Sequence, residues 1–251
     1  MRNRSLLPKR TIRGHDRPPT NPGRAAGISG NQHQRAEWTK SELALFRKLS
    51  SPAAIQRYLN RLAYDPDYGA RSPRWIIRER KAHCFEGAIF AAAALRHLGH
   101  RPRLVDIECW NDDDHVIAVF KEAGHWGSIA KSNFTVIRFR ELVYRSLREL
   151  VMSYFDFSFN SLGQKTMRSY SLPLDLSRFD GRRWMTTDED LEYIGDKLNT
   201  TRHFSVLTRR MIRRLSLADG DLVKGGLLGA NPKGLYKPKR KPTTKTSSAM
   251  E

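Results

Sequence analysis

The segment that most constrains the fold is CFEGAIFAAAALRHL, residues 84–98, which is small and apolar on nearly every side. A helix of this composition cannot present one face to water, so it must be buried on several sides. Gly99 follows it and is suited to end a helix in a left-handed conformation. We therefore expect a central helix that begins at Cys84, with other elements packed around it.

Three short strands are expected after this helix. Residues 103–110 alternate apolar and polar side chains, residues 115–120 are mostly apolar, and a third segment spans residues 126–131. Turns rich in Asn, Asp and Gly separate these segments, as is typical of antiparallel hairpins. The sequence thus predicts the α+β class, with a buried helix that bears a cysteine packed on an antiparallel sheet.

Further helices are expected on both sides of this unit. Thr39 and Glu42 have the spacing of a capping box before an apolar run. Ser51 and Pro52 are a favourable N-cap and first helical residue for a second helix. Residues 141–155 place apolar side chains at helical spacing and predict an amphipathic helix.

The net charge of +19 is concentrated at the two ends of the chain. Residues 1–40 carry nine Lys and Arg against two acidic residues, and residues 232–251 carry six against one. Both ends are rich in residues that bury too little apolar surface to offset the entropy lost on ordering. We expect a basic disordered arm over residues 1–37, a domain over residues 38–217, and a basic flexible tail over residues 218–251.

Composition also bears on location and partners. No apolar run is long enough to cross a bilayer and no secretory segment is evident, so we expect a cytoplasmic protein without a membrane partner. Cys84 and Cys109 are too few for a disulfide framework and lack metal-motif spacing, so we expect no metal or cofactor. The basic ends and the Arg-rich residues 209–214 suit nonspecific contact with nucleic acid phosphates.

Cys84 and His115 together indicate cysteine chemistry. A thiol is a strong nucleophile only as a thiolate, and the N–H groups of a helix's first turn stabilise negative charge there. An imidazole that faces Cys84 from the start of the next strand can accept the thiol proton. We therefore expect His115 to lie against Cys84, and Cys84 to react with iodoacetamide below about pH 8.

A family resemblance rests on four features of this region. Cys84 opens an alanine-rich helix, and a Leu-Gly turn over residues 98–103 leads into a strand. His115 begins the next strand, and Trp126 lies on the one after. Residues 83–134 thus resemble the transglutaminase-like core of the papain-like superfamily. The resemblance implies acyl transfer from a peptide or protein amide to an amine or to water, with Cys84 as nucleophile and His115 as general base and acid.

The third catalytic residue departs from the family pattern. The aspartate expected a few residues after Trp126 is missing, because residues 127–133 hold no carboxylate. We expect Ser128 or Asn133 to orient the imidazole through a neutral hydrogen bond, with Ser128 favoured by its strand phase and Asn133 by its chemistry. Asp106 and Asp114 are possible substitutes from other elements.

Three functions stay open at this point. The first is thiol-dependent amide hydrolysis or acyl transfer, the second is a catalytically silent scaffold of the same fold, and the third is a basic nucleic-acid-associated protein. The run Asp112-Asp113-Asp114 is suited either to bind a cation or an amine, or to form a solvated turn. His83 is expected to cap the helix or to support the site.

Overall fold

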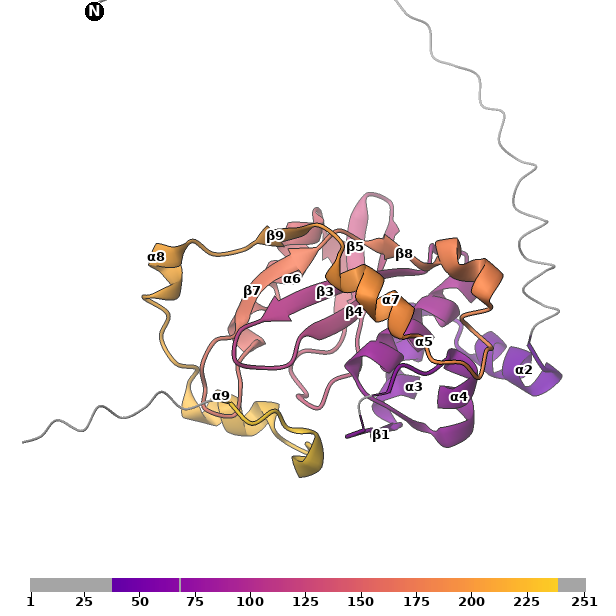
Figure 1. Ribbon diagram of the computed structural model, residues 1–251, viewed down its shortest axis with the longest axis horizontal. Helices are drawn as coiled ribbons and strands as arrows, with labels where there is room; N and C mark the ends of the chain where they lie inside the picture. The colour runs from indigo at the N-terminus through magenta and orange to yellow at the C-terminus, as the bar shows by residue number, and fades with distance from the viewer. Residues whose placement is uncertain (1–37, 68, 239–251) are drawn as a thin grey trace, which may run out of the picture. The chain divides into compact units, whose positions relative to one another are not determined.

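Seven strands form one antiparallel sheet in the computed structural model, which describes residues 38–67 and 69–238. The strands lie in the order β6–β5–β4–β3–β7–β9, and β8 also pairs with β3 (Figure 1). The strand bounds are β3 Arg103–Cys109, β4 His115–Glu122, β5 His125–Ile129, β6 Arg140–Tyr144, β7 Met167–Ser171, β8 Leu174–Asp175 and β9 His203–Ser205. Together with the helices this sheet makes the chain α+β, as the sequence predicts.

Helices cover both faces of the sheet. One face carries α2, α3, α4, α5 and α7, whereas α6 packs on the other face. The helix bounds are α2 Lys40–Lys48, α3 Pro52–Asn60, α4 Pro73–Glu79, α5 Cys84–His97, α6 Leu147–Met152, α7 Glu192–Asn199, α8 Arg209–Ile212 and α9 Gly220–Gly226. Short 3-10 helices lie at η1 Phe155–Phe157, η2 Leu176–Arg182 and η3 Pro232–Gly234, and a separate two-stranded sheet pairs β1 Ala63–Tyr64 with β2 Lys81–Ala82.

The N-terminal helices begin where their capping residues predict. The Thr39 hydroxyl accepts from the Glu42 N–H at 3.2 Å, and the Glu42 carboxylate accepts from the Thr39 N–H at 2.7 Å. The Ser51 hydroxyl accepts from the N–H of Ala54 at 3.2 Å, and Pro52 occupies the first helical position. These contacts satisfy N–H groups that a helix start otherwise leaves without partners.

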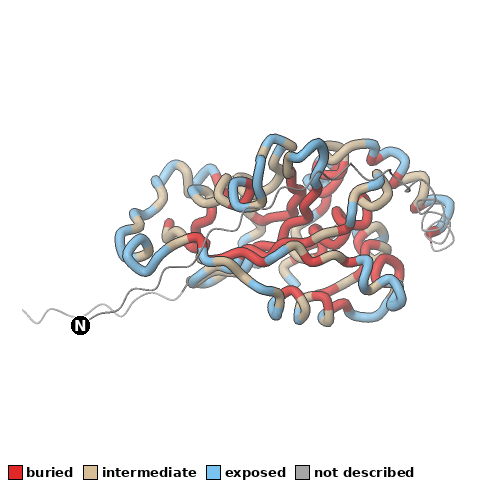
Figure 2. The backbone as a smooth tube through the Cα atoms, turned by 90° about the horizontal axis from the view of Figure 1, so that it is seen from above, coloured by how far each residue is buried: buried red, intermediate tan, exposed pale blue. Residues whose placement is uncertain are grey.

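Helix α5 is the centre of the larger core. Every residue from Glu86 to Leu95 is buried, as the apolar composition of the segment requires. Gly99 ends the helix region with φ +92°, which agrees with its expected role. Figure 2 shows the buried backbone running through the middle of the structure, with exposed segments around it.

Strand alternation divides the side chains of β4 between the two faces. Val116, Ala118 and Phe120 join the core formed with α5. Ile117 and Val119 join the second core, on the α6 side. Because neighbouring strand residues point to opposite faces, this phase also fixes the direction of His115, which shares the α6 face.

Two expectations for the C-terminal half are wrong. Residues 141–155 do not form one helix, because β6 ends at Tyr144 and α6 begins only after Ser146, whose hydroxyl accepts from the Glu149 N–H at 3.1 Å. Residues 218–238 are not a flexible tail, since they form α9 and η3 and hydrogen-bond to the domain. The arm expected over residues 1–37 and the tail beyond residue 238 lie outside the described residues.

Within residues 38–67 and 69–238, no helix combines the length and apolar character needed to cross a bilayer.

Candidate functional site

Cys84 is the first residue of α5, and His83 is its N-cap. The His83 Nδ1 atom accepts from the Phe85 N–H at 3.3 Å, while the Glu86 carboxylate accepts from the His83 N–H at 3.4 Å. His83 therefore has the capping role considered for it. This cap fixes the direction of the helix start and presents the thiol at the end of the sheet.

The Cys84 thiol lies beside the edge of β4. Its S–H donates to the backbone oxygen of Asp114 at 3.6 Å. The nearby Val116 N–H acts to lower the pKa of the thiol. Pairing of β5 with β4 ends at Ile129, opposite Ala118, so the earlier peptide groups of β4 have no partner from β5. The thiol thus lies at the part of β4 that β5 leaves unpaired and hydrogen-bonds to the peptide group before His115.

The His115 ring is held on the α6 side of the sheet. Its Nε2 lies 2.9 Å from the backbone oxygen of Ile137, and its ring meets the ring of Tyr154 edge-on, with centroids 6.2 Å apart. A carbonyl oxygen can only accept, so Nε2 must carry the proton of this hydrogen bond. In the neutral imidazole, Nδ1 is then the nitrogen with a free lone pair.

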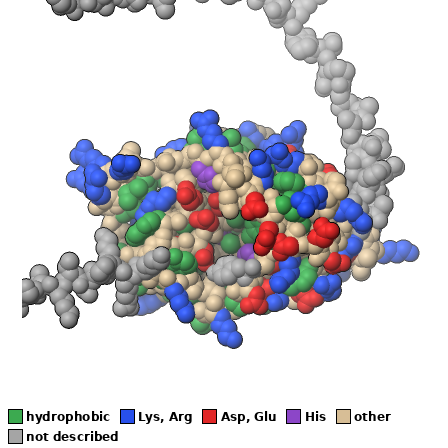
Figure 3. Space-filling model, viewed as in Figure 1, with side chains coloured by type: hydrophobic (Ala, Val, Ile, Leu, Met, Phe, Trp, Pro, Cys, Tyr) green, Lys and Arg blue, Asp and Glu red, His purple; other side chains and the backbone are tan. Residues whose placement is uncertain are grey.

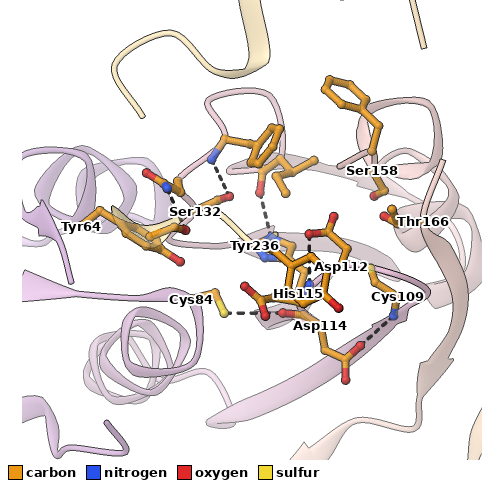
Figure 4. A pocket seen from close by; sticks show the side chains of 16 residues that line it. Tyr64, Cys84, Cys109, Asp112, Asp114, His115, Ser132, Ser158, Thr166 and Tyr236 are labelled. Atoms are coloured by element: carbon orange, nitrogen blue, oxygen red, sulfur yellow. Dashed lines mark hydrogen bonds between the residues drawn. The ribbon is translucent and has the colours of Figure 1, made fainter. Parts of the chain in front are cut away.

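Cys84 and His115 line the same cavity (Figure 4), but no hydrogen bond joins the two side chains and each bonds elsewhere. The expectation that His115 lies against Cys84 is therefore not confirmed. The cavity has a volume of about 50 Å³. That is room for a few water molecules and not for a peptide side chain with its backbone. Gly234 and Tyr236, from the C-terminal segment, complete its wall.

Burial dominates the electrostatics of the pair. It raises the pKa of the Cys84 thiol to about 12, and the charges of Asp113 and Asp106 act in the same direction. It lowers the pKa of the His115 imidazole to about 4. Proton transfer from thiol to imidazole would therefore cost on the order of 10 kcal/mol before the attraction of the two charges is counted. Both shifts favour the neutral forms of the two groups, which argues against the expectation of a ready thiolate.

A prediction for alkylation follows from the thiol pKa. Because the thiolate fraction grows with pH until the pKa is reached, we expect iodoacetamide to label Cys84 about tenfold faster per pH unit between about pH 7 and about pH 10. Mass spectrometry of the Cys84 peptide from the native full chain measures this rate. A plateau below about pH 8.5 would show a thiol of ordinary or lowered pKa and would contradict this assignment.

Neither Ser128 nor Asn133 orients His115, so that expectation is wrong. Ser128 shares the α6 face with His115, as its strand phase predicts, but its hydroxyl hydrogen-bonds to the Tyr154 hydroxyl at 2.8 Å. The Asn133 carboxamide is engaged by the backbone of the C-terminal segment, with its oxygen accepting from the Asn231 N–H at 2.7 Å. The backbone oxygen of Ile137 orients the His115 ring instead.

The two substitute carboxylates also have other partners. The Asp106 carboxylate lies 3.1 Å from the His203 Nε2, and Asp114 accepts from the Cys109 N–H at 2.7 Å. Burial raises the pKa of Asp106 to about 6. Neither carboxylate hydrogen-bonds to His115, so the candidate site is a thiol and an imidazole with a backbone carbonyl as third group.

The loop of three aspartates is part of the cavity wall and not a fully solvated turn. Asp112, Asp113 and Asp114 all line the cavity, and burial raises the pKa of Asp112 to about 7. On the face drawn in Figure 3, Asp and Glu side chains gather toward the middle while many Lys and Arg lie near the edge. The loop therefore gives the cavity an acidic side.

Two parts of the site, the Ile137 backbone oxygen and the segment with Gly234 and Tyr236, could not be recognised from the residue types in the sequence. The Ile137 carbonyl is a backbone acceptor, which any residue could supply. Gly234 and Tyr236 come from a segment whose composition predicted disorder. The Ile137 carbonyl could have been predicted only from the strand order, which brings residues 131–137 beside the start of β4.

Comparison of the sequence with protein-family models gives no match, and comparison with curated proteins gives none either. Among the described residues, no group of three or more His, Cys, Asp or Glu side chains is arranged to hold a metal ion.

Proposed function

We propose that the protein is a cysteine-dependent enzyme that hydrolyses an amide, or transfers its acyl group to an amine, on a peptide or protein substrate. The observation that carries this proposal is the position of the Cys84 thiol. It lies at the first turn of α5, donates a hydrogen bond to the backbone oxygen of Asp114 next to His115, and shares a cavity with the imidazole. The resemblance of residues 83–134 to transglutaminase-like domains supports the same two roles.

The proposed step uses the neutral forms of both groups. The Cys84 sulfur attacks the amide carbonyl carbon while its proton passes to Nδ1 of His115, the nitrogen not engaged by Ile137. The imidazolium then gives that proton to the departing nitrogen, the C–N bond breaks, and a thioester to Cys84 remains. Water or an amine attacks the thioester, losing its proton to His115, and the thiol is restored.

Solvation of the cavity controls this step. Burial is the main cause of the raised thiol pKa, and the Val116 and Phe85 N–H groups oppose it. When water or substrate enters the cavity, the Cys84 thiol is less dehydrated, but the N–H groups and the helix start still stabilise its negative charge. The pKa of the thiol then falls and the thiolate forms more easily. The Ile137 carbonyl supports the imidazolium less than a carboxylate would, which favours a slow enzyme.

The test is amide turnover by the full chain on a glutamine-containing peptide, measured as ammonia release with and without a primary amine. We expect ammonia release in both cases, with the amine incorporated when it is present, and loss of both after Cys84 has been alkylated. Failure to detect turnover on a panel of peptide amides, while Cys84 remains chemically reactive, would contradict the proposal.

A catalytically silent scaffold is the second candidate. The observation that favours it is that the closed site holds a neutral thiol that donates to a backbone carbonyl, and an imidazole with no carboxylate partner. Such a protein would keep its fold and its binding partners after Cys84→Ala, and turnover would be absent in both forms.

A further inference from the structure

The C-terminal segment returns to the cavity after α9 and forms part of its wall through Gly234 and Tyr236. Thr135 holds the end of α9, since its N–H donates to the Gly226 backbone oxygen at 2.9 Å and its hydroxyl donates to the Gly225 backbone oxygen at 3.0 Å. The chain then passes through η3 to Tyr236, which lines the cavity together with Cys84. In Figure 1 this yellow segment runs from α9 toward β1.

Asn133 binds the main chain of this segment. Its carboxamide oxygen accepts from the Asn231 N–H at 2.7 Å, and its Nδ2 donates to the backbone oxygens of Asn231 at 2.9 Å and Gly234 at 3.0 Å. Asn133 is buried, and all three partners are backbone atoms. Main-chain contacts of this kind do not depend on the side chains of the bound segment, so other peptides can make them.

Tyr64 sets a size limit at one position of the segment. A Cβ atom on Gly234 would lie 2.6 Å from Cε1 and 2.8 Å from Cδ1 of Tyr64. Contacts this short force one group to move, so a residue without a side chain fits here and a branched one does not. Next to it, the Asn231 side chain donates to the Tyr64 backbone oxygen at 3.3 Å.

We propose that Tyr64 and Asn133 form a binding site for the main chain of a peptide turn, like that of η3, in a peptide that leads to Cys84, with a preference for glycine opposite Tyr64. Residues 231–236 of this chain occupy the site in cis and keep the cavity too small for a substrate. Only the statement that the bound peptide is a substrate rests on the proposed function. Binding and closure stand on the contacts of Asn133 and Tyr64 alone.

Alkylation of Cys84 in full-chain variants tests closure. Gly234→Val should displace the segment by its contact with Tyr64 and raise the labelling rate at least about tenfold, because opening is no longer the limiting step. Asn133→Ala, which removes three hydrogen bonds to the segment, should also raise it. Gly225→Ala is the matched control, since its Cβ would meet nothing within 4 Å, and it should label like the unchanged protein.

A peptide added in trans tests the binding site. The nine-residue peptide Ala230–Pro238, at millimolar concentration, should slow Cys84 labelling in Gly234→Val back toward the rate of the unchanged protein. The same peptide carrying valine in place of Gly234 should not slow it. The double variant Asn133→Ala/Gly234→Val should stay unprotected with either peptide.

Two results would overturn the inference. One is a labelling rate in both Gly234→Val and Asn133→Ala equal to that of the unchanged protein. The other is fast labelling in Gly234→Val that the peptide does not slow. Since alkylation needs no turnover, these outcomes are separate from failure of the proposed function, in which labelling and protection behave as expected while no amide is consumed.

Discussion

Replacing Cys84 by alanine is expected to lower amide turnover at least about 10⁴-fold, because the nucleophile that forms the thioester is removed. Turnover is measured as ammonia release by the full chain under saturating peptide amide. The fold should be unaffected, since among the described residues the thiol makes one weak hydrogen bond, to the Asp114 backbone oxygen at 3.6 Å. Thermal unfolding measured on the same samples checks this.

Cys109→Ala is the matched control for that experiment. Cys109 ends β3 and lines the same cavity, but its S–H donates to the Ile107 backbone oxygen at 3.6 Å and it does not lie at a helix start. Turnover of this variant should stay within about threefold of the unchanged protein, as expected for a conservative change without a catalytic role. Equal losses in the two cysteine variants would contradict the assignment of Cys84.

Gly87→Ala is expected to destabilise the fold by about 3 kcal/mol, because the new methyl group would enter space already filled by Lys131. A Cβ atom on Gly87 would lie 2.2 Å from the Lys131 Cβ and 3.5 Å from its Cα, so backbone must move. Lys131 has little freedom to yield, since its Nζ donates to the backbone oxygens of Leu59 and Leu62 at 3.0 and 2.6 Å. Urea unfolding measures the effect.

Gly195→Ala provides the control in another helix. The new Cβ would lie 3.7 Å from Phe85 Cζ, which is an ordinary contact. Since alanine is the better helix former, this variant should be unchanged or more stable by up to about 1 kcal/mol. Similar destabilisation in Gly87→Ala and Gly195→Ala would show that helix glycines, and not the approach of α5 to Lys131, set the loss.

The parts of the fold that local sequence determines were predictable. The start of α2 follows from Thr39 and Glu42, and the start of α5 and its burial follow from its apolar composition. The β3–β4–β5 meander follows from short turns between apolar segments. These features depend on contacts between residues close in the sequence, so a single sequence suffices to find them.

The parts that depend on distant pairing were not predictable. β7 pairs with β3 at Ile107 and Tyr170, more than sixty residues apart, and no local pattern marks that partner. The helix predicted over residues 141–155 was wrong because a strand with alternating exposure, followed by a short helix, places apolar residues at nearly helical spacing. Val143, which points to solvent in β6, shows the difference, and the Ser146 N-cap was the missed signal.

The side chains of the candidate site could be predicted from the sequence, but the backbone groups that hold them and form the cavity wall could not. The chain order of Cys84 and His115 on a helix start and a strand start brings both to one cavity. The third group is a backbone carbonyl, and the wall formed by Gly234 and Tyr236 depends on hydrogen bonds from Asn133 to the main chain. Hydrogen bonds to backbone atoms do not depend on residue type, so they could not be predicted from the sequence, and side chains were predicted in their place.

The central claim is that Cys84 forms a covalent thioester during amide turnover. The direct measurement is rapid acid quench of the full chain mixed with a peptide amide, followed by mass spectrometry of the Cys84 peptide. We expect an acyl adduct on Cys84 that is removed by hydroxylamine, forms before ammonia release reaches its steady rate, and is absent in Cys84→Ala. Ammonia released at the same rate by Cys84→Ala, or by the unchanged protein without any adduct on Cys84, would contradict it.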